Sequence, residues 1–329
     1  MTTEAPSLND IKDAARRLTG LAVRTPLLDC PAADTVCGGR IFIKAEMLQR
    51  TGSFKFRGAY NRISRLTEDE RGRGVVAFSS GNHAQAVAAV SGFFGIAATI
   101  VMPSDAPAMK IEATRNYGAT VILYDRFTES REDIAAEIVS GQGATLVPPF
   151  DHPLIIAGQG TAGLEIAEDM AARGTAPDQV LVPCSGGGLI AGIATAVTAH
   201  YPDCRVHAVE PSGFDDMTRS LISGHRETAD PEARSICDAL LVPTPGELTF
   251  SINRNLLAGG LAVEDAAVRA AMAFAFRHLK LVAEPGGAIA LAAALSGKID
   301  CTDKTTVVVM SGGNVDTALF AEVLGQTSG

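Results

Sequence analysis

Ser53-Phe54-Lys55-Phe56-Arg57-Gly58-Ala59 places a lysine between two phenylalanines, where a loop is predicted to become a helix that runs to about Leu66. Lysine is normally a solvated surface residue. Apolar rings around its amine would exclude water, and desolvation lowers the pKa of an amine and makes it a nucleophile toward carbonyl groups. The alternative is a basic first helical turn whose Lys55 and Arg57 face water. Motifs elsewhere in the chain help to decide between a desolvated lysine and a solvated one.

The composition is that of a globular protein with ample material for a core. The chain has 329 residues, enough for two domains of about 150 residues each. It is 47% hydrophobic and 20% charged, and contains 33 glycines. Its net charge is −9 and it contains no basic block, which argues against a nucleic-acid partner. A small anion remains a possible ligand, because backbone N–H groups and helix dipoles can bind one.

The cysteines and the N-terminus indicate the compartment. The six cysteines are scattered and form neither a C-x-x-C pair nor a zinc-like cluster. They predict free thiols in a reducing environment. The stretch Met1–Asp10 is polar and lacks the apolar region of a signal peptide, and no apolar run is long enough to span a bilayer. We therefore expect a cytoplasmic protein without a membrane partner.

Apolar strands alternate with helices in two series, which predicts an α/β protein with two doubly wound parallel sheets. The first series follows Gly74, with strands expected at 75–78, 97–102, 120–123 and 144–147. The second follows Asp151, with strands expected at 179–183, 205–210 and 304–310 and a long helix at 263–279. A short strand at 41–46 is expected to join the second sheet. The larger domain would then be discontinuous, 1–73 and 151–329, with a smaller domain, 74–150, inserted in it.

Three glycine-rich turns follow predicted strands, and ligands of open α/β sheets bind beyond the carboxyl ends of strands. In Ser185-Gly186-Gly187-Gly188-Leu189, successive N–H groups and the following helix suit a phosphate. The turn lacks the Lys-Ser/Thr of a nucleotide P-loop and the spacing of a dinucleotide motif, so a single phosphate monoester fits better. The alternative is that these glycines only allow close packing of helix on strand.

The other two turns offer polar groups at the same edge. Ser79-Ser80-Gly81-Asn82-His83 has hydroxyls and an amide at a helix start, which suit a carboxylate or a phenolate oxygen, and Ser311 follows an apolar strand. The alternative for both is ordinary helix capping. A nucleophilic lysine, a turn suited to a phosphate and a turn suited to a carboxylate together suggest pyridoxal phosphate held as a Schiff base.

Five motifs, in order over Ile11 to Asp316, resemble the fold-type II pyridoxal phosphate enzymes, whose fold is tryptophan synthase β-like. The motifs begin at Ser53, Ser79, Gly186, Glu284 (Glu284-Pro285-Gly286-Gly287-Ala288) and Ser311 (Ser311-Gly312-Gly313-Asn314). Within that group they resemble the serine/threonine dehydratase and serine racemase family, including its 3-hydroxyaspartate dehydratase branch. The resemblance implies a cofactor in the cleft between the domains, a mobile small domain on the substrate side, and a homodimer.

The resemblance also implies roles for single residues. Lys55 would form the Schiff base and act as acid and base on one face of the cofactor, and Ser80 would act on the other. Asn82 would bind the phenolic oxygen and Ser311 the pyridine nitrogen. The implied cofactor contacts are Phe54, Lys55, Asn82, Ser185, Gly186, Gly187, Gly188, Leu189, Glu284 and Ser311. The implied substrate contacts are Ser79, Ser80, Asn82, His83 and Arg131.

The stretch Glu210–Asp216 resembles the divalent-cation site of serine racemase. Glu210, the carbonyl of Phe214 and Asp216 would be the ligands. Two carboxylates and a carbonyl suit a hard cation, Mg²⁺ first, with Ca²⁺ or Mn²⁺ as alternatives. The other interpretation is a capped helix start, with Asp215 and Asp216 meeting the helix dipole.

Two further features bear on the substrate. Arg131 matches a ligand-side arginine of racemases and 3-hydroxyaspartate dehydratases, and could pair with a distal carboxylate; alternatively it is a solvated helix charge. The loop Val242–Leu248 does not resemble its counterpart in animal serine racemase. We expect a dehydratase that converts 3-hydroxyaspartate, serine or threonine to an oxo acid and ammonia. The alternatives are a serine racemase with side dehydratase activity, a non-catalytic module that binds a phosphorylated metabolite, and a nucleotide-dependent enzyme.

Overall fold

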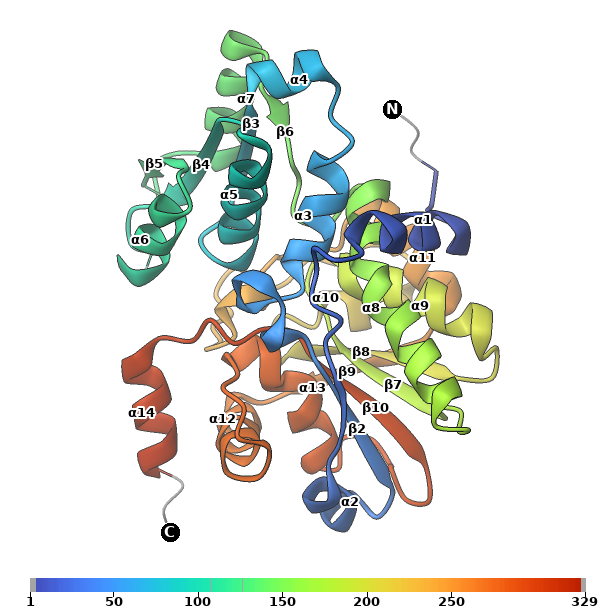
Figure 1. Ribbon diagram of the computed structural model, residues 1–329. Coiled ribbons are helices and arrows are strands. Elements are labelled where there is room, and N and C mark those ends of the chain that lie inside the picture. Colours follow the sequence, from blue (N-terminus) through green and yellow to red (C-terminus); the bar gives the residue numbers. More distant parts are fainter. Residues whose placement is uncertain (1–3, 107, 126, 327–329) are drawn as a thin grey trace.

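The computed structural model describes residues 4–106, 108–125 and 127–326, whose strands form two separate sheets (Figure 1). Residues 1–3 and 327–329 of the expected larger domain lie outside the described residues. The six-stranded sheet contains β1 (Leu27–Asp29), β2 (Arg40–Ala45), β7 (Gln179–Pro183), β8 (Arg205–Pro211), β9 (Leu257–Val263) and β10 (Thr305–Met310). The four-stranded sheet contains β3 (Val75–Phe78), β4 (Ala98–Pro103), β5 (Thr120–Tyr124) and β6 (Thr145–Leu146).

Helices fill the connections, as the alternating pattern predicts. Those joined to the four-stranded sheet are α4 (Glu68–Arg73), α5 (Asn82–Phe94), α6 (Ala108–Asn116) and α7 (Arg131–Gln142). The remaining α-helices are α1 (Leu8–Leu18), α2 (Pro31–Cys37), α3 (Lys55–Ile63), α8 (Pro153–Ala172), α9 (Gly188–His200), α10 (Asp216–Ser223), α11 (Glu247–Leu256), α12 (Asp265–Phe274), α13 (Pro285–Leu295) and α14 (Thr317–Gln326). None of the helices in the described ranges is long and apolar enough to cross a membrane.

The six-stranded sheet has the order β1-β2-β10-β7-β8-β9 and is parallel except for β1, which pairs antiparallel with β2. The strand expected near residue 41 therefore does join this sheet, beside β10. Its side chains alternate between two cores: Ile41 and Ile43 face α12 and α13, whereas Phe42 faces α8 and α9. Helices thus cover both faces of the sheet (Figure 1), which explains why its inner strands are almost continuously apolar.

The four-stranded sheet has the order β5-β4-β3-β6 and is parallel throughout. Val75 and Ala77 of β3 pack against α3 and α5, and Val76 packs against α7 on the other face. The chain runs outward from β3 to β4 and β5, then returns to the other side of β3 as β6. A crevice for a ligand is expected at such a reversal, beyond the carboxyl ends of β3 and β6.

Several elements were not predicted. They are β1, α2, α4, α11 and β9, and the helix expected at 263–279 begins only at Asp265 because β9 continues to Val263. The sequence of β9 includes Gly259 and Gly260, which weaken a strand pattern. Gly260 has a packing reason, since a Cβ there would lie 2.1 Å from the hydroxyl of Thr218. α12 also ends early, at Phe274, where a π-helical turn begins.

Candidate active site

The reversal in the four-stranded sheet brings the Ser79 turn beside the segment that follows β6. His83, at the start of α5, is buried, and its Nε2 lies 2.8 Å from the carbonyl oxygen of Val147. Only an N–H can donate to a carbonyl, so Nε2 carries the proton. Burial lowers the pKa of His83 to about 3, so the ring is neutral. His83 therefore brings no positive charge to a carboxylate, and its substrate role remains a prediction.

Lys55 lies at the start of α3, which bridges the two sheets. Its Nζ donates to the carbonyl of Pro149 at 2.8 Å and lies 5.1 Å from the centroid of the Phe54 ring. Burial lowers the pKa of Lys55 to about 8, partly opposed by the nearby carboxylate of Glu284. The amine is thus desolvated, as the flanking rings predict, and a larger share of it is neutral near pH 8 than for an ordinary lysine.

Backbone bonds tie the lysine segment to the turn after β10. The N–H of Phe54 donates to the carbonyl of Ser311 at 3.2 Å, and Gly313 donates to the carbonyl of Gly52 at 2.9 Å. The side chain of Ser311 is almost fully buried, yet it makes no hydrogen bond to a described residue. Ser311 thus presents an unpartnered hydroxyl beside the lysine.

Arg57 is a residue whose environment the sequence did not reveal. It does not face water: its side chain is 1% exposed. Its guanidinium donates to both oxygens of Glu46 at 2.8 Å, and to those of Glu165 at 2.7 and 2.8 Å. Lys44 donates to the same Glu165 at 2.6 Å. Burial alone would raise the pKa of Glu46, but Arg57 and Lys44 outweigh it and hold that pKa below its usual value.

A signal for this network exists in hindsight. Lys44 interrupts the apolar strand β2, Glu46 follows directly after it, and Glu165 interrupts the apolar helix α8. Charged residues at such positions are almost never buried unless they are paired. The network fixes the first turn of α3, and so the position of Lys55.

Two carbonyl groups of the glycine turn after β7 are engaged by side chains of α11. The carbonyl of Gly186 accepts from Thr249 Oγ1 at 2.6 Å, and that of Gly187 accepts from Asn253 Nδ2 at 3.2 Å. The backbone N–H groups of Ser185 through Leu189 donate to no described residue. A row of free N–H groups at the start of α9 is what an anion requires.

The same glycines are also needed for packing, so the alternative weighed from the sequence holds as well. A Cβ on Gly186 would lie 2.4 Å from the ring of Phe150, and one on Gly188 would lie 2.7 Å from Gln159. Gly187 has φ = +91°, in the left-handed region that favours glycine. Close packing and free N–H groups are compatible, because the packing restricts what could be attached at the Cα atoms and leaves the N–H groups without an acceptor among the described residues.

Asn82 connects the two sheets. Its Nδ2 donates to Glu284 at 2.5 Å, and its Oδ1 accepts from Asn314 Nδ2 at 2.7 Å. Asn314, a motif residue with no predicted role, also donates to the carbonyl of Thr51 at 2.8 Å and so fixes the Asn82 amide. Burial raises the pKa of Glu284 to about 7, with Asp238 adding to the effect.

The remaining expected substrate residues lie around the Ser79 turn. Ser79 Oγ accepts from the N–H of Gly81 at 3.2 Å, whereas the half-buried Ser80 makes no side-chain hydrogen bond to a described residue. Arg131 has its guanidinium 5.1 Å from the ring centroid of Phe78, the residue before Ser79, and pairs with the adjacent Glu132 at 2.8 Å. Its side chain is 40% exposed, so it lies beside the turn with donors still accessible.

The expected metal ligands lie together at the start of α10. Glu210 is buried and accepts from the N–H groups of Met217 and Thr218 at 2.9 and 2.8 Å, so it caps the helix. Asp215 and Asp216 do lie at the helix start, as the capping interpretation has it, but neither side chain makes a capping hydrogen bond. Both oxygens of the buried Asp216 lack a partner among the described residues, and no N–H there donates to the carbonyl of Phe214.

Glu210 and Asp216 have too little positive charge around them to favour their ionised forms. Burial raises the pKa of Glu210 to about 8, with Asp216 adding to the effect, and burial raises that of Asp216 to about 7. No cluster of three or more His, Cys, Asp or Glu side chains suited to a metal exists in the described ranges. A cation here would rely on two carboxylates, the carbonyl of Phe214 and water.

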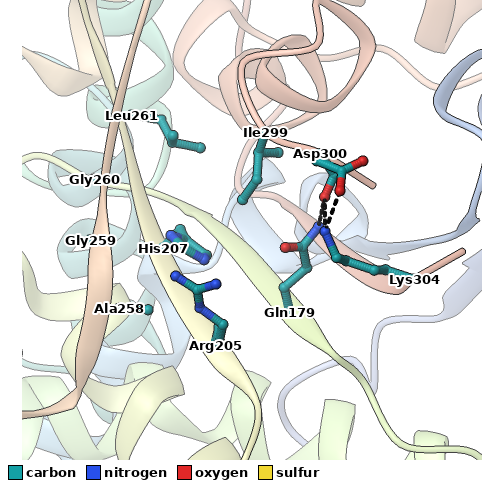
Figure 2. A pocket seen from close by; sticks show the side chains of 10 residues that line it. All are labelled: Gln179, Arg205, His207, Ala258, Gly259, Gly260, Leu261, Ile299, Asp300 and Lys304. Carbon is teal, nitrogen blue, oxygen red and sulfur yellow. Dashed lines mark hydrogen bonds and ion pairs between the residues drawn. The ribbon is translucent and has the colours of Figure 1, made fainter. Parts of the chain in front are cut away.

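Another hollow, with a volume of about 310 Å³, lies at the opposite edge of the six-stranded sheet (Figure 2). It adjoins Gln179 and Arg205 at the amino ends of β7 and β8, and Lys304, whose ammonium pairs with Asp300 at 2.7 Å. It contains none of the predicted site residues. The candidate active site is instead the region at the carboxyl ends of the strands, where hydrogen bonds join the predicted turns to the lysine segment.

Comparison with known proteins agrees with this geometry. A family model described as "Pyridoxal-phosphate dependent enzyme" matches residues 18–312. The chain is 44% identical over 319 residues to an L-threo-3-hydroxyaspartate ammonia-lyase from Pseudomonas sp, covering 97% of this chain and 98% of the relative. It is 39% identical to a serine racemase from Schizosaccharomyces pombe, covering 98% of both chains. The structure of maize serine racemase superposes with a TM-score of 0.91 at 37% identity, covering 98% of each chain.

Proposed function

Because the chain belongs to the family of pyridoxal-phosphate dependent enzymes, we propose that it is an ammonia-lyase acting on a β-hydroxy amino acid. The observation that carries the proposal is the desolvated amine of Lys55 at the edge where the glycine turn, Ser311 and the Ser79 turn converge. The reaction removes the α-proton and the β-hydroxyl as water. The enamine that results becomes an imine, and its hydrolysis gives a 2-oxo acid and ammonia.

The polar groups at this edge fit the cofactor. Those of the glycine turn and Ser311 lack a partner among the described residues, whereas Asn82 Nδ2 already donates to Glu284 and has a second N–H to offer. The N–H groups of Ser185 to Leu189 would hold its phosphate, the hydroxyl of Ser311 its pyridine nitrogen, and the amide of Asn82 its phenolic oxygen. Phe54 would pack beside the ring, with Glu284 at its rim. When bound, pyridoxal phosphate supplies the electron sink for the charge left by α-proton removal.

The protein's own groups would move the protons. Lys55, with a pKa of about 8, is suited to take the α-proton near neutral pH. Ser311 offers the pyridine nitrogen a hydroxyl, which, unlike a carboxylate, does not keep that nitrogen protonated. A weaker electron sink favours loss of a β-leaving group over transamination. The Ser79 turn, with its helix N-terminus, would receive the substrate carboxylate.

Within this class we favour 3-hydroxyaspartate, ahead of serine and threonine. Arg131 beside the Ser79 turn could pair with a second carboxylate. A relative at 44% identity is named for that activity. The test is ammonia release from both enantiomers of serine and threonine and from all four isomers of 3-hydroxyaspartate. Turnover of serine or threonine at least tenfold above every hydroxyaspartate isomer would refute the substrate, and no ammonia from any would refute the reaction.

A second candidate is serine racemase, favoured by one observation. Ser80 is half-buried, and its hydroxyl is free to act on the face opposite Lys55. The Schizosaccharomyces pombe relative is named as a serine racemase. Chiral chromatography of serine after incubation would detect the activity.

A divalent cation is proposed for Glu210, the Phe214 carbonyl and Asp216, with Mg²⁺ first and Ca²⁺ or Mn²⁺ as alternatives. The support is the pair of unpartnered Asp216 oxygens in a buried, acidic position. A cation between Glu210 and Asp216 would offset the electrostatic repulsion between these two carboxylates.

Three further properties are proposed. Residues 74–150 would form a mobile substrate-side domain inserted in a larger one, 1–73 and 151–329; the separate four-stranded sheet supports this. A homodimer is supported by exposed apolar side chains such as Leu48 and Phe93, and native mass spectrometry would test it. A cytoplasmic location is supported by six free cysteines.

A further inference from the structure

We propose that a cavity between α1, α3 and the start of α8 binds a small metabolite through its phosphate or carboxylate group, with the buried guanidinium of Arg62 as the central contact. The cavity has a volume of about 500 Å³, within the usual range of ligand sites. None of the active-site or metal residues discussed above lines it. Arg62 lies seven residues after Lys55 on α3, roughly 10 Å further along the helix axis.

Arg62 is a buried cation that forms no ion pair in the described ranges, although the carboxylate of Glu70 lies near enough to offset part of its charge. Its side chain lines the cavity, yet the residue is only 6% exposed. In the described ranges its Nε has no acceptor, and no carboxylate lies within ion-pair distance of its guanidinium. Burial lowers its pKa, but arginine remains charged in proteins. Burying a charge is costly unless it is paired, so an anion in the cavity would supply what this part of the chain lacks.

Two more arginines line the cavity. Arg17 donates from Nη1 to Asn61 Oδ1 at 2.9 Å, and Arg65 makes no hydrogen bond or ion pair through its side chain in the described ranges. The donors that remain on both could reach an anion held by Arg62. Three guanidinium groups around one hollow suit phosphate or carboxylate oxygens, which they bind in fork geometry.

Three carboxylates also line the cavity, so their hydrogen-bond partners decide whether the arginines remain available to an anion. Asp10 accepts from the N–H and hydroxyl of Ser7, and Glu70 accepts from those of Thr67, so both are engaged in capping boxes. Glu4 is exposed. Asp10 lies near Arg65 and Arg17, and Glu70 near Arg62, so these carboxylates offset part of the positive charge. Neither forms a hydrogen bond or ion pair with these arginines in the described ranges, so the guanidinium donors remain available.

His152 completes the cavity at the start of α8. Its Nδ1 accepts from the N–H of Leu154 at 3.1 Å, and burial, with Arg62 adding to the effect, lowers its pKa to about 4. The ring is therefore neutral, and its Nε2–H is a possible donor to an anion. The 20-residue helix α8 begins here and directs its positive end toward the same region.

The test is calorimetric titration of the holoenzyme at pH 8 and low salt, with inorganic phosphate in one arm and succinate in the other. Saturable one-to-one binding of either probe is expected, and the probe that binds tells phosphate from carboxylate. Arg62→Met should weaken the binding at least tenfold. The control Arg16→Met, on α1 with an exposed side chain, should leave the Kd within twofold.

Two more variants make the result decisive. Arg131→Ala should not change the Kd of the probe. If this variant no longer bound the probe, the anion would belong to the active site and the proposal would be overturned. If Arg62→Met does not fold, Arg65→Met replaces it, with at least threefold weaker binding expected. The proposal is also overturned if the wild-type protein binds neither probe, or if the folded cavity variant keeps the wild-type Kd.

Discussion

Replacing Arg57 by methionine should destabilise the protein strongly, because the change leaves Glu46 buried without its main counter-charge. Methionine retains much of the volume but none of the four bonds of 2.7–2.8 Å to Glu46 and Glu165. Breaking a buried ion pair from one side costs about 3–5 kcal/mol. With an unfolding entropy of about 2.1 cal/mol/K per residue, a loss of about 4 kcal/mol in 329 residues lowers Tm by about 6 °C.

The sign of the pH dependence follows from Glu46. In the wild-type protein its pKa is lowered, so its contribution to stability is present above its ordinary pKa and is lost in acid. In the variant, burial without Arg57 should raise the folded pKa above the unfolded one. The carboxyl then takes up a proton as pH falls, and the deficit in the free energy of unfolding should be smaller at pH 5 than at pH 8.

Urea unfolding of the holoenzyme, followed by circular dichroism at both pH values, measures this deficit. The control Arg16→Met removes an arginine whose side chain is 74% exposed, and should change stability by less than about 0.5 kcal/mol. Adding Glu46→Gln to Arg57→Met should recover part of the loss, since it removes the stranded charge. A deficit below about 1 kcal/mol, or one equal at pH 5 and pH 8, would refute the reasoning.

Four predictions concern the reaction. Lys55→Ala should lower kcat at least about a thousandfold and should lose the cofactor label that borohydride fixes in the wild-type protein; a retained label would place the attachment elsewhere. Ser80→Ala should spare elimination from one enantiomer and abolish chemistry on the other, whereas equal loss for both would count against a two-face assignment. EDTA should lower wild-type activity and Mg²⁺ restore it, while Asp216→Asn should not respond and the control Asp215→Asn should; indifference of the wild-type enzyme to both reagents would rule out the cation. Arg131→Ala should raise KM for 3-hydroxyaspartate about 10- to 100-fold, the range expected for loss of a charged hydrogen bond, and should leave KM for serine unchanged. A parallel rise of KM for both substrates would show that Arg131 does not bind the distal carboxylate.

The sequence predicted both sheets because buried parallel strands are continuous apolar runs, as in Val75–Phe78 and Thr305–Met310. It missed β9, whose two glycines interrupt such a run. The turns at the carboxyl ends were recognisable because glycine, serine and asparagine have special roles where a strand becomes a helix.

Other parts of the candidate site had no local signature. The acceptor for Lys55 is the carbonyl of Pro149, and a backbone carbonyl leaves no mark in a sequence. The pairing of Arg57 with Glu46 and Glu165 depends on which elements pack together. Asn314 was recognisable as part of its motif, but its hydrogen bond to the Asn82 amide depends on how the segment after β10 packs against the start of α5.

The position of β10 has a consequence for the order in which the protein can assemble. The last strand of the chain lies inside its sheet, with Thr305 opposite Arg40 on one side and Thr306 opposite Gln179 on the other. During synthesis β2 and β7 must wait for it, whereas the four-stranded sheet is complete once residue 146 has emerged. The four-stranded sheet can therefore form first, and the six-stranded sheet closes only once β10 has emerged. Ser311 and Asn314 follow β10 directly, so a chain truncated before β10 would lack both the central strand of this sheet and these two residues of the candidate active site.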